Sequence, residues 1–127
     1  MIRIEFDIDL FEKAENFLKS IKPLLYTNDY TFRQHEKNLQ FDRQYNLTNK
    51  QKINIIMSLE AKDCIKIEPN NNPRYKDSEV YVFLRDETLV IYGEEDQVKL
   101  YIKMYQSELP SYNKVIVISF HQEGVFD

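Results

Sequence analysis

The sequence predicts an α+β domain in which N-terminal helices pack on one face of a C-terminal antiparallel β-sheet. Two observations predict this class. Two stretches before residue 60, about 9–23 and 48–60, carry apolar residues at helical spacing, whereas after about residue 78 apolar residues occur in short runs of β-forming residues separated by turn signals. The chain has 127 residues, of which 43% are hydrophobic, 2 are Gly and 4 are Pro. We therefore expect one globular domain over residues 1–127.

The first predicted elements are a short strand and a long helix. Apolar residues alternate with charged ones over residues 2–8, which is the pattern of a strand with one buried face. Asp9 followed by Glu12 resembles a capping box, and apolar residues at helical spacing continue until Pro23. This pattern predicts a helix that begins at Asp9 and ends at Pro23.

Two further helices and four strands follow. A short helix is predicted near residues 36–45, and Thr48 with Gln51 forms a second capping box that predicts a helix to about residue 60. Prolines and asparagines between residues 68 and 73 indicate a loop. The strands are expected as a meander over residues 79–85, 89–92, 99–106 and 114–121, with turns at 86–87, 94–96 and 109–111.

Composition and patterning exclude several classes of protein. No apolar run is long enough to cross a bilayer, and the acidic residues near the N-terminus differ from the basic start of a signal peptide. The single cysteine, Cys64, cannot form an internal disulfide, so we expect a cytoplasmic protein that contacts no membrane. Two histidines and one cysteine give no ligand spacing for zinc, and glycine-rich phosphate loops are missing, so neither a metal nor a cofactor is expected.

Charge is unevenly distributed along the chain, whose net charge is -4. Residues 32–66 carry seven basic and four acidic side chains, whereas residues 67–98 carry three basic and eight acidic ones. Within the basic segment, Arg33, His35, Lys37 and Arg43 form a basic cluster. They form either a solvated helix face or a surface that contacts RNA phosphates or an acidic protein segment.

Four segments of the chain occur in an order that is found in a known family. They are Lys62-Asp63 directly after a helix, Val80–Phe83, Leu100–Lys103 and Val115–His121. Their order and spacing resemble the MqsR family of bacterial toxins, which are RelE-like endoribonucleases of type II toxin-antitoxin systems. The resemblance covers about residues 30–123. It implies a RelE-like fold, metal-independent cleavage of mRNA, and a cognate antitoxin protein that neutralises the enzyme.

The same resemblance implies positions for an active site. Matched motif by motif, the family's catalytic positions fall on Lys66, Tyr101 and His121. Some members have lysine where His121 stands, and the position nearest to the family's catalytic glutamine is Val82. Because of these two departures, the resemblance leaves the general acid and the general base unassigned.

The residue types themselves suit this reaction. Attack of a ribose 2′-hydroxyl on phosphorus needs a base, an acid for the leaving 5′-oxygen, and cations for the added negative charge. Histidine titrates nearest neutral pH, so His121 is the candidate for proton transfer. Lys66 and Lys103 are candidates for binding the phosphate, and Arg33 and Lys37 are further candidate RNA phosphate contacts.

Strand alternation indicates which of these side chains share a face. Along residues 99–106 the even-numbered apolar residues are expected to face the helices, which leaves Tyr101, Lys103 and Tyr105 together on an open face. On the last strand, strict alternation groups Val115, Val117, Ser119 and His121. His121 therefore joins Tyr101 only if this partly apolar set points outward.

A second hypothesis stays open at this point. The chain can instead be a non-catalytic protein-binding module, such as a degenerate toxin or a phage-borne interaction protein. The acidic balance of residues 67–98 favours this reading, because acidic groups beside an RNA groove repel phosphate.

Overall fold

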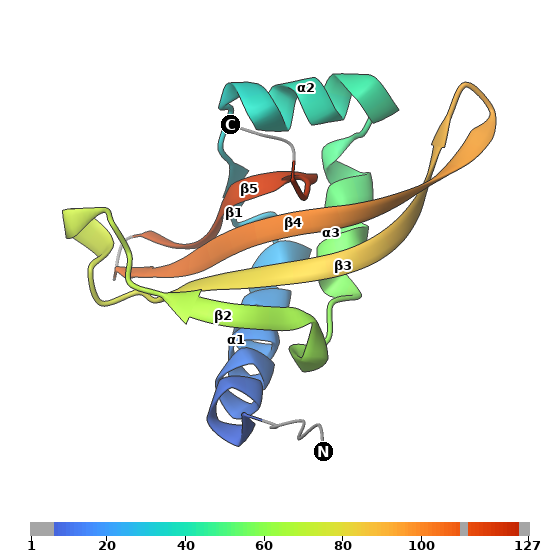
Figure 1. Ribbon diagram of the computed structural model, residues 1–127. Helices are drawn as coiled ribbons and strands as arrows, with labels where there is room; N and C mark the ends of the chain where they lie inside the picture. Colours follow the sequence, from blue (N-terminus) through green and yellow to red (C-terminus); the bar gives the residue numbers. More distant parts are fainter. Residues whose placement is uncertain (1–6, 110–111, 125–127) are drawn as a thin grey trace, which may run out of the picture.

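The computed structural model describes residues 7–109 and 112–124, and within them it contains three α-helices and one five-stranded mixed sheet (Figure 1). The predicted α+β class is confirmed, with the helices in the N-terminal half. The elements are α1 (Ile8–Tyr26), β1 (Tyr30–Phe32), α2 (Glu36–Tyr45), α3 (Asn49–Met57), the 3-10 turn η1 (Ala61–Asp63), β2 (Cys64–Glu68), the 3-10 turn η2 (Pro73–Tyr75), β3 (Val80–Ile91), β4 (Glu94–Leu109) and β5 (Tyr112–Gln122).

Helix α1 begins earlier and ends later than predicted. Its N-cap is Asp7, whose side chain accepts a hydrogen bond from the Leu10 backbone N–H at 3.0 Å, so the predicted cap at Asp9 is wrong. Pro23 lies inside the helix rather than at its end. The last turn persists because Leu25 is buried in the core, at 3% exposed. The predicted strand at residues 2–8 lies outside the described residues, except for the cap and first residue of α1.

The two shorter helices follow the sequence signals. Helix α2 occupies the predicted range. The capping box before α3 is present, with the Thr48 backbone N–H donating to Gln51 Oε1 at 2.8 Å and the Gln51 N–H donating to Thr48 Oγ1 at 3.2 Å. Local capping chemistry is thus sufficient to place the start of α3, but the predicted end near residue 60 is wrong, because α3 ends at Met57 and the 3-10 turn η1 follows at Ala61.

The sheet has the order β1-β5-β4-β3-β2, and its one parallel pair is β1 with β5. The prediction of a wholly antiparallel sheet is therefore wrong in one strand. Neither β1 nor β2 was predicted, because the three residues of β1 are too few to show a period and the five residues of β2 end directly before the loop signal at Pro69. Parallel pairing of β1 brings the segment between β1 and α2 against the C-terminal strand.

The predicted turn at Asp86-Glu87 is wrong, because β3 runs through it as one 12-residue strand. The chain reverses instead at Tyr92-Gly93, where φ is 51° and 78°, the positive values at both central positions that a type I′ hairpin turn requires. The predicted turn at 94–96 therefore belongs to β4. The predicted turn at 109–111 falls between β4 and β5, partly on residues 110–111 outside the described residues.

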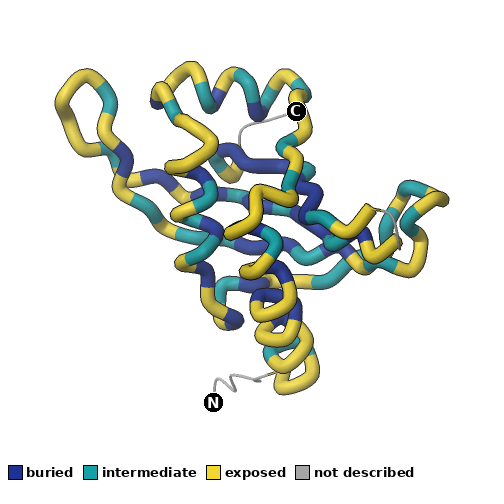
Figure 2. The backbone as a smooth tube through the Cα atoms, turned by 180° about the vertical axis from the view of Figure 1, so that it is seen from behind, coloured by how far each residue is buried: buried dark blue, intermediate teal, exposed yellow. Residues whose placement is uncertain are grey.

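Helices α1 and α3 pack behind the sheet in the view of Figure 1. In Figure 2, which shows the molecule from that side, many of the buried residues lie between these helices and the sheet. Phe17 of α1 stacks on Tyr81 of β3, with ring centroids 4.0 Å apart. Helix α2 lies at the β5 edge, where Phe41 packs near Phe120. No helix in the described part of the chain has the length and apolarity needed to span a membrane.

Candidate functional site

Two rows of side chains cross the sheet on the face opposite α1 and α3, here called the open face. Residues paired directly across neighbouring strands point to the same side. The register therefore aligns Lys66, Val82, Lys103 and Ser119 in one row, and Leu84, Tyr101 and His121 in the next. On β4 the even-numbered residues Leu100, Ile102 and Met104 are all 0% exposed in the core, as alternation predicts. The two rows bring together residues from β2 to β5.

A β-bulge at Ile118 decides which way His121 points. Lys103 pairs with Ser119 but Met104 pairs with Val117, so Ile118 is the extra residue of β5. The bulge shifts the alternation by one position, which leaves Val117 in the core on the helix side and places His121 on the open face opposite Tyr101. Strict alternation along β5 predicted that Val117 and His121 lie on the same face of the sheet. That prediction is wrong, because the extra residue lies between them.

Two side chains near the start of α2 hold the bulge. The Ile118 carbonyl accepts hydrogen bonds from His35 Nε2 at 2.8 Å and from Asn38 Nδ2 at 3.0 Å. Asn38 Oδ1 accepts from the Phe120 backbone N–H at 2.9 Å, and Asn38 is 3% exposed. These bonds satisfy backbone groups that the bulge removes from the strand ladder. The orientation of His121 thus depends on contacts about eighty residues away in sequence.

The His121 ring lies between two other rings and is largely buried. It stacks on Tyr101, with ring centroids 5.6 Å apart and planes 24° from parallel, and it meets His35 edge-on at 6.2 Å. Its Nδ1 lies 2.9 Å from the Gln122 carbonyl oxygen. Because a carbonyl only accepts, Nδ1 carries the proton, and in the neutral ring Nε2 keeps its lone pair.

The environment of His121 favours its neutral form. Burial, to 7% exposed, lowers the pKa of this imidazole below its ordinary 6.5. The hydrogen bond to Gln122 opposes the shift, whereas the charges of Lys37 and His35 lower the pKa further. A neutral imidazole with a free Nε2 lone pair is a competent proton acceptor at neutral pH.

The two lysines in the adjacent row share one carboxylate. Glu68 Oε1 lies 2.8 Å from Lys66 Nζ, and Glu68 Oε2 lies 3.1 Å from Lys103 Nζ. The hydrogen bond from Lys66, followed by that from Lys103, outweighs burial and lowers the pKa of Glu68, while the bond to Glu68 raises the pKa of Lys66. The three groups together carry one net positive charge. Glu68 was not predicted as a site residue, because it precedes Pro69 and was read as the start of a loop.

The remaining predicted residues lie around the same face. The Arg33 guanidinium hydrogen-bonds the phenolic oxygen of Tyr105, which is 1% exposed on the open face. Lys37 lies close enough to His121 for its charge to affect that pKa. Tyr101 lies close enough to Lys66 for the two to interact electrostatically. The structure thus brings the four predicted strand residues to one side of the sheet, with His121 on Tyr101 and Lys66 joined to Lys103 through Glu68. Arg33 and Lys37 lie beside them.

Val82, the position that the resemblance matches to a catalytic glutamine, supplies no polar group. Val82 is 0% exposed and lies between the two lysine positions of its row. Cys64 is also buried, which raises the pKa of its thiol and agrees with its interpretation as a small core residue. Among the described residues, no three His, Cys, Asp or Glu side chains gather as a possible metal site.

No protein-family model, curated protein or solved structure matches this chain.

Proposed function

We propose that this protein is an endoribonuclease toxin of RelE-like fold that cleaves single-stranded mRNA in the cytoplasm without a metal ion, and that a cognate antitoxin protein neutralises it. The observation that carries the proposal is the convergence of a neutral imidazole, a phenol and two ammonium groups on one face. These groups come from β2, β4 and β5, and they match the proton-transfer and charge requirements of 2′-hydroxyl attack.

In this mechanism His121 is the general base. Its Nε2 lone pair accepts the proton of the ribose 2′-hydroxyl while the 2′-oxygen forms a bond to phosphorus. The bond from phosphorus to the 5′-oxygen then breaks. The products are a 2′,3′-cyclic phosphate and a fragment with a free 5′-hydroxyl. Because only 7% of His121 is exposed, the substrate ribose must approach through the small accessible part of the residue.

Tyr101 is assigned as the general acid and the lysines as the phosphate clamp. The Tyr101 hydroxyl donates a proton to the departing 5′-oxygen, and the positive charge of Lys66 stabilises the phenolate that remains. Lys66 and Lys103 also stabilise the additional charge on the phosphorane. A well-placed donor of this kind is worth about 3 to 4 kcal/mol in related oxyanion sites.

The test is to map the ends of RNA after incubation with the purified protein, with and without EDTA. We expect fragments that end in 2′,3′-cyclic phosphate at a preferred short sequence, in equal yield in both conditions. Tyr101→Phe keeps the ring that stacks on His121 and should remove most of the activity. Intact RNA, or cleavage that EDTA abolishes, would contradict the proposed mechanism.

The pH dependence of cleavage should reflect the shifted pKa of His121. Because the base must be unprotonated, kcat/KM should fall as the pH falls through the pKa of His121, which lies below 6.5. The acid limb of the pH profile should therefore have its midpoint below that value. A profile measured with a dinucleotide substrate checks this, and a midpoint above 6.5 would argue against His121 as the base.

Replacing Glu68 by glutamine should strengthen RNA binding at low salt. In the free protein the carboxylate neutralises part of the charge of Lys66 and Lys103. Its removal should make the plot of log affinity against log salt steeper by about 0.7, the contribution of one additional phosphate contact on a single strand. Fluorescence anisotropy with a non-cleavable 2′-fluoro RNA measures this slope. Glu15→Gln on α1 is the matched control, and an unchanged slope in Glu68→Gln would refute the expectation.

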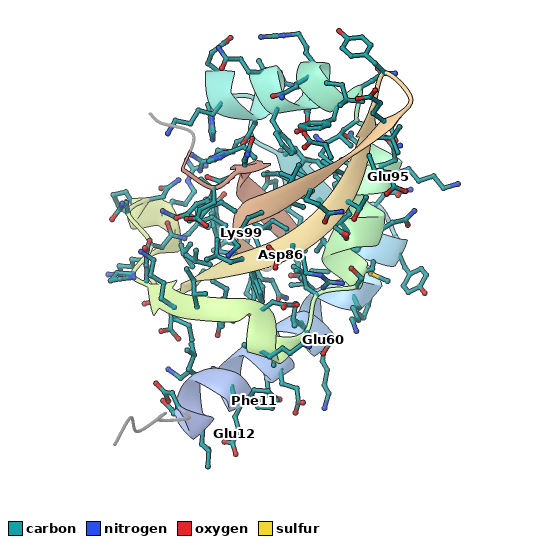
Figure 3. The ribbon with its side chains drawn as sticks, turned by 45° about the vertical axis from the view of Figure 1, so that its right-hand side comes forward. Phe11, Glu12, Glu60, Asp86, Glu95 and Lys99 are labelled. Carbon is teal, nitrogen blue, oxygen red and sulfur yellow. The ribbon has the colours of Figure 1, made fainter. Side chains whose placement is uncertain are left out.

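A specific surface supports the second candidate function, a non-catalytic protein-binding module. The β3–β4 hairpin extends beyond the other strands (Figure 1), and Glu95 lies on it (Figure 3). At its end Tyr92 is 98% and Val90 is 59% exposed, beside several acidic residues. Induction in a bacterial host separates the two functions. Growth arrest that a co-expressed neighbouring reading frame relieves supports the toxin, whereas unaffected growth supports the module.

A further inference from the structure

A pocket of about 290 Å³ adjoins the lysine row of the open face. It lies between the asparagine-rich loop that follows β2 and the strands β3, β4 and β5. Its walls are formed by Arg33, Pro69, Asn70, Asn71, Asn72, Val80, Lys103 and Ile118. Lys103 therefore belongs both to the proposed catalytic face and to this pocket.

Two cations in the pocket keep donors for a ligand. The Lys103 ammonium has three donors and gives one to Glu68 at 3.1 Å. The Arg33 guanidinium has five donors and hydrogen-bonds the phenolic oxygen of Tyr105. N–H groups of both side chains therefore remain available. Two such groups flanking one pocket suit a phosphate.

The loop provides an amide that is free to read a base. Asn70 is used within the loop, where its Nδ2 donates to the Ser78 carbonyl at 3.1 Å and its Oδ1 accepts from the Asn72 N–H at 2.9 Å. The exposed Asn71 side chain has no hydrogen bond within the described residues. An unpaired amide offers a donor and an acceptor, which is the pattern that recognises the edge of a base.

The floor and the size of the pocket complete the argument. Val80 and Ile118 form an apolar surface below the polar groups, and Val80 is 2% exposed. The volume lies near the lower end of the range for small-molecule sites, so it suits one nucleotide rather than a folded element. The pocket lies next to the row that contains Lys66 and Lys103, and neighbouring rows are about 7 Å apart along a strand.

We infer that this pocket binds the unpaired nucleotide adjacent to the scissile phosphodiester, with its phosphate between Arg33 and Lys103 and its base edge on Asn71. The inference rests on the proposed function, because it takes the ligand of the open face to be single-stranded RNA. It assigns sequence selection to the loop after β2, whereas the proton-transfer groups lie on β4 and β5.

The experiment measures binding rather than cleavage. A short 2′-fluoro RNA, which lacks the attacking hydroxyl, is titrated as the intact strand and as a series in which one base at a time is removed. Wild-type protein should lose about tenfold or more in affinity when the base in the pocket is missing. Asn71→Ala should bind the intact strand more weakly but should show little further loss for that same abasic RNA. Asn54→Ala, on the exposed face of α3, is the matched control and should behave as wild type.

The outcomes separate the inference from the proposed cleavage. If Asn71→Ala weakens every abasic RNA by the same factor, or if no position is sensitive, the pocket does not read a base and the inference is wrong. The inference is also wrong if the wild-type protein does not bind the intact 2′-fluoro RNA at all. Coupling between Asn71 and one base in a protein that leaves natural RNA intact supports the pocket and refutes the nuclease. Cleavage without such coupling supports the nuclease and refutes the pocket.

Discussion

Replacing His121 by glutamine should reduce RNA cleavage by roughly 10² to 10⁴-fold at neutral pH, the usual contribution of a positioned proton-transfer group. Glutamine retains a polar side chain of similar length, so the buried space beside Tyr101 stays filled while the titratable nitrogen is lost. The rate is measured with a short RNA under single-turnover conditions, which separates the chemical step from product release. Binding of the 2′-fluoro RNA by the variant should change little.

His35 provides the control for this variant. His35→Gln keeps an amide N–H that can donate to the Ile118 carbonyl, and it removes the other histidine of the chain. Its loss of rate should be much smaller than that of His121→Gln. Equal losses in the two variants would mean that the paired rings matter for packing and that His121 is not the base. Thermal unfolding of both proteins shows whether a loss of folded protein contributes to the result.

Asn38→Ala should destabilise the fold by about 2 to 4 kcal/mol, because it leaves the buried Phe120 N–H without an acceptor and removes a donor to the Ile118 carbonyl. Urea denaturation measures the free energy of unfolding. The same change should lower cleavage in the protein that remains folded, since the bulge that turns His121 toward Tyr101 loses a support. This readout separates a positioning role from stability alone.

Two further variants sharpen the test of Asn38. Asn38→Asp keeps an acceptor for the Phe120 N–H but loses the donors to the Ile118 and Arg33 carbonyls, so its stability should lie between those of wild type and Asn38→Ala. Asn54→Ala on the exposed side of α3 should change the free energy of unfolding by less than about 0.5 kcal/mol. If Asn38→Ala is no less stable than this control, the hydrogen bonds to the bulge contribute little.

The sequence predicts the parts of this fold that depend on local chemistry. The capping box before α3 follows from neighbouring residues, and regular alternation on β4 places Tyr101 and Lys103 together. Predictions failed where the outcome depends on distant contacts. Pro23 does not end α1, because burial of Leu25 in the core stabilises the last turn. Strand β1 has only three residues, so its sequence shows no strand pattern, and it is recognised as a strand only because it pairs with β5.

The candidate site shows the same division. The faces on which the β4 side chains lie were predictable from their alternation. The orientation of His121 was not, because the bulge at Ile118 is held by side chains at the start of α2. Glu68 was missed because Pro69 made the segment look like a loop. A signal for it does exist: Lys66 and Glu68 are two residues apart, so on a strand they share a face. A short strand ending at Glu68 would have placed this carboxylate beside Lys66.

The tight reversal at Tyr92-Gly93 limits how the hairpin can vary in length. Its two-residue loop fixes which residue of β3 faces which residue of β4. Deleting one residue between Gly93 and Tyr101, with the reversal kept in place, would turn the phenol and the Lys103 amine into the core and expose apolar side chains. Losing two residues from each arm preserves both the facing pairs and the hydrogen-bonded type of the pair that closes the turn, and it only shortens the projection. Natural variants of this hairpin should therefore differ by two residues in each arm.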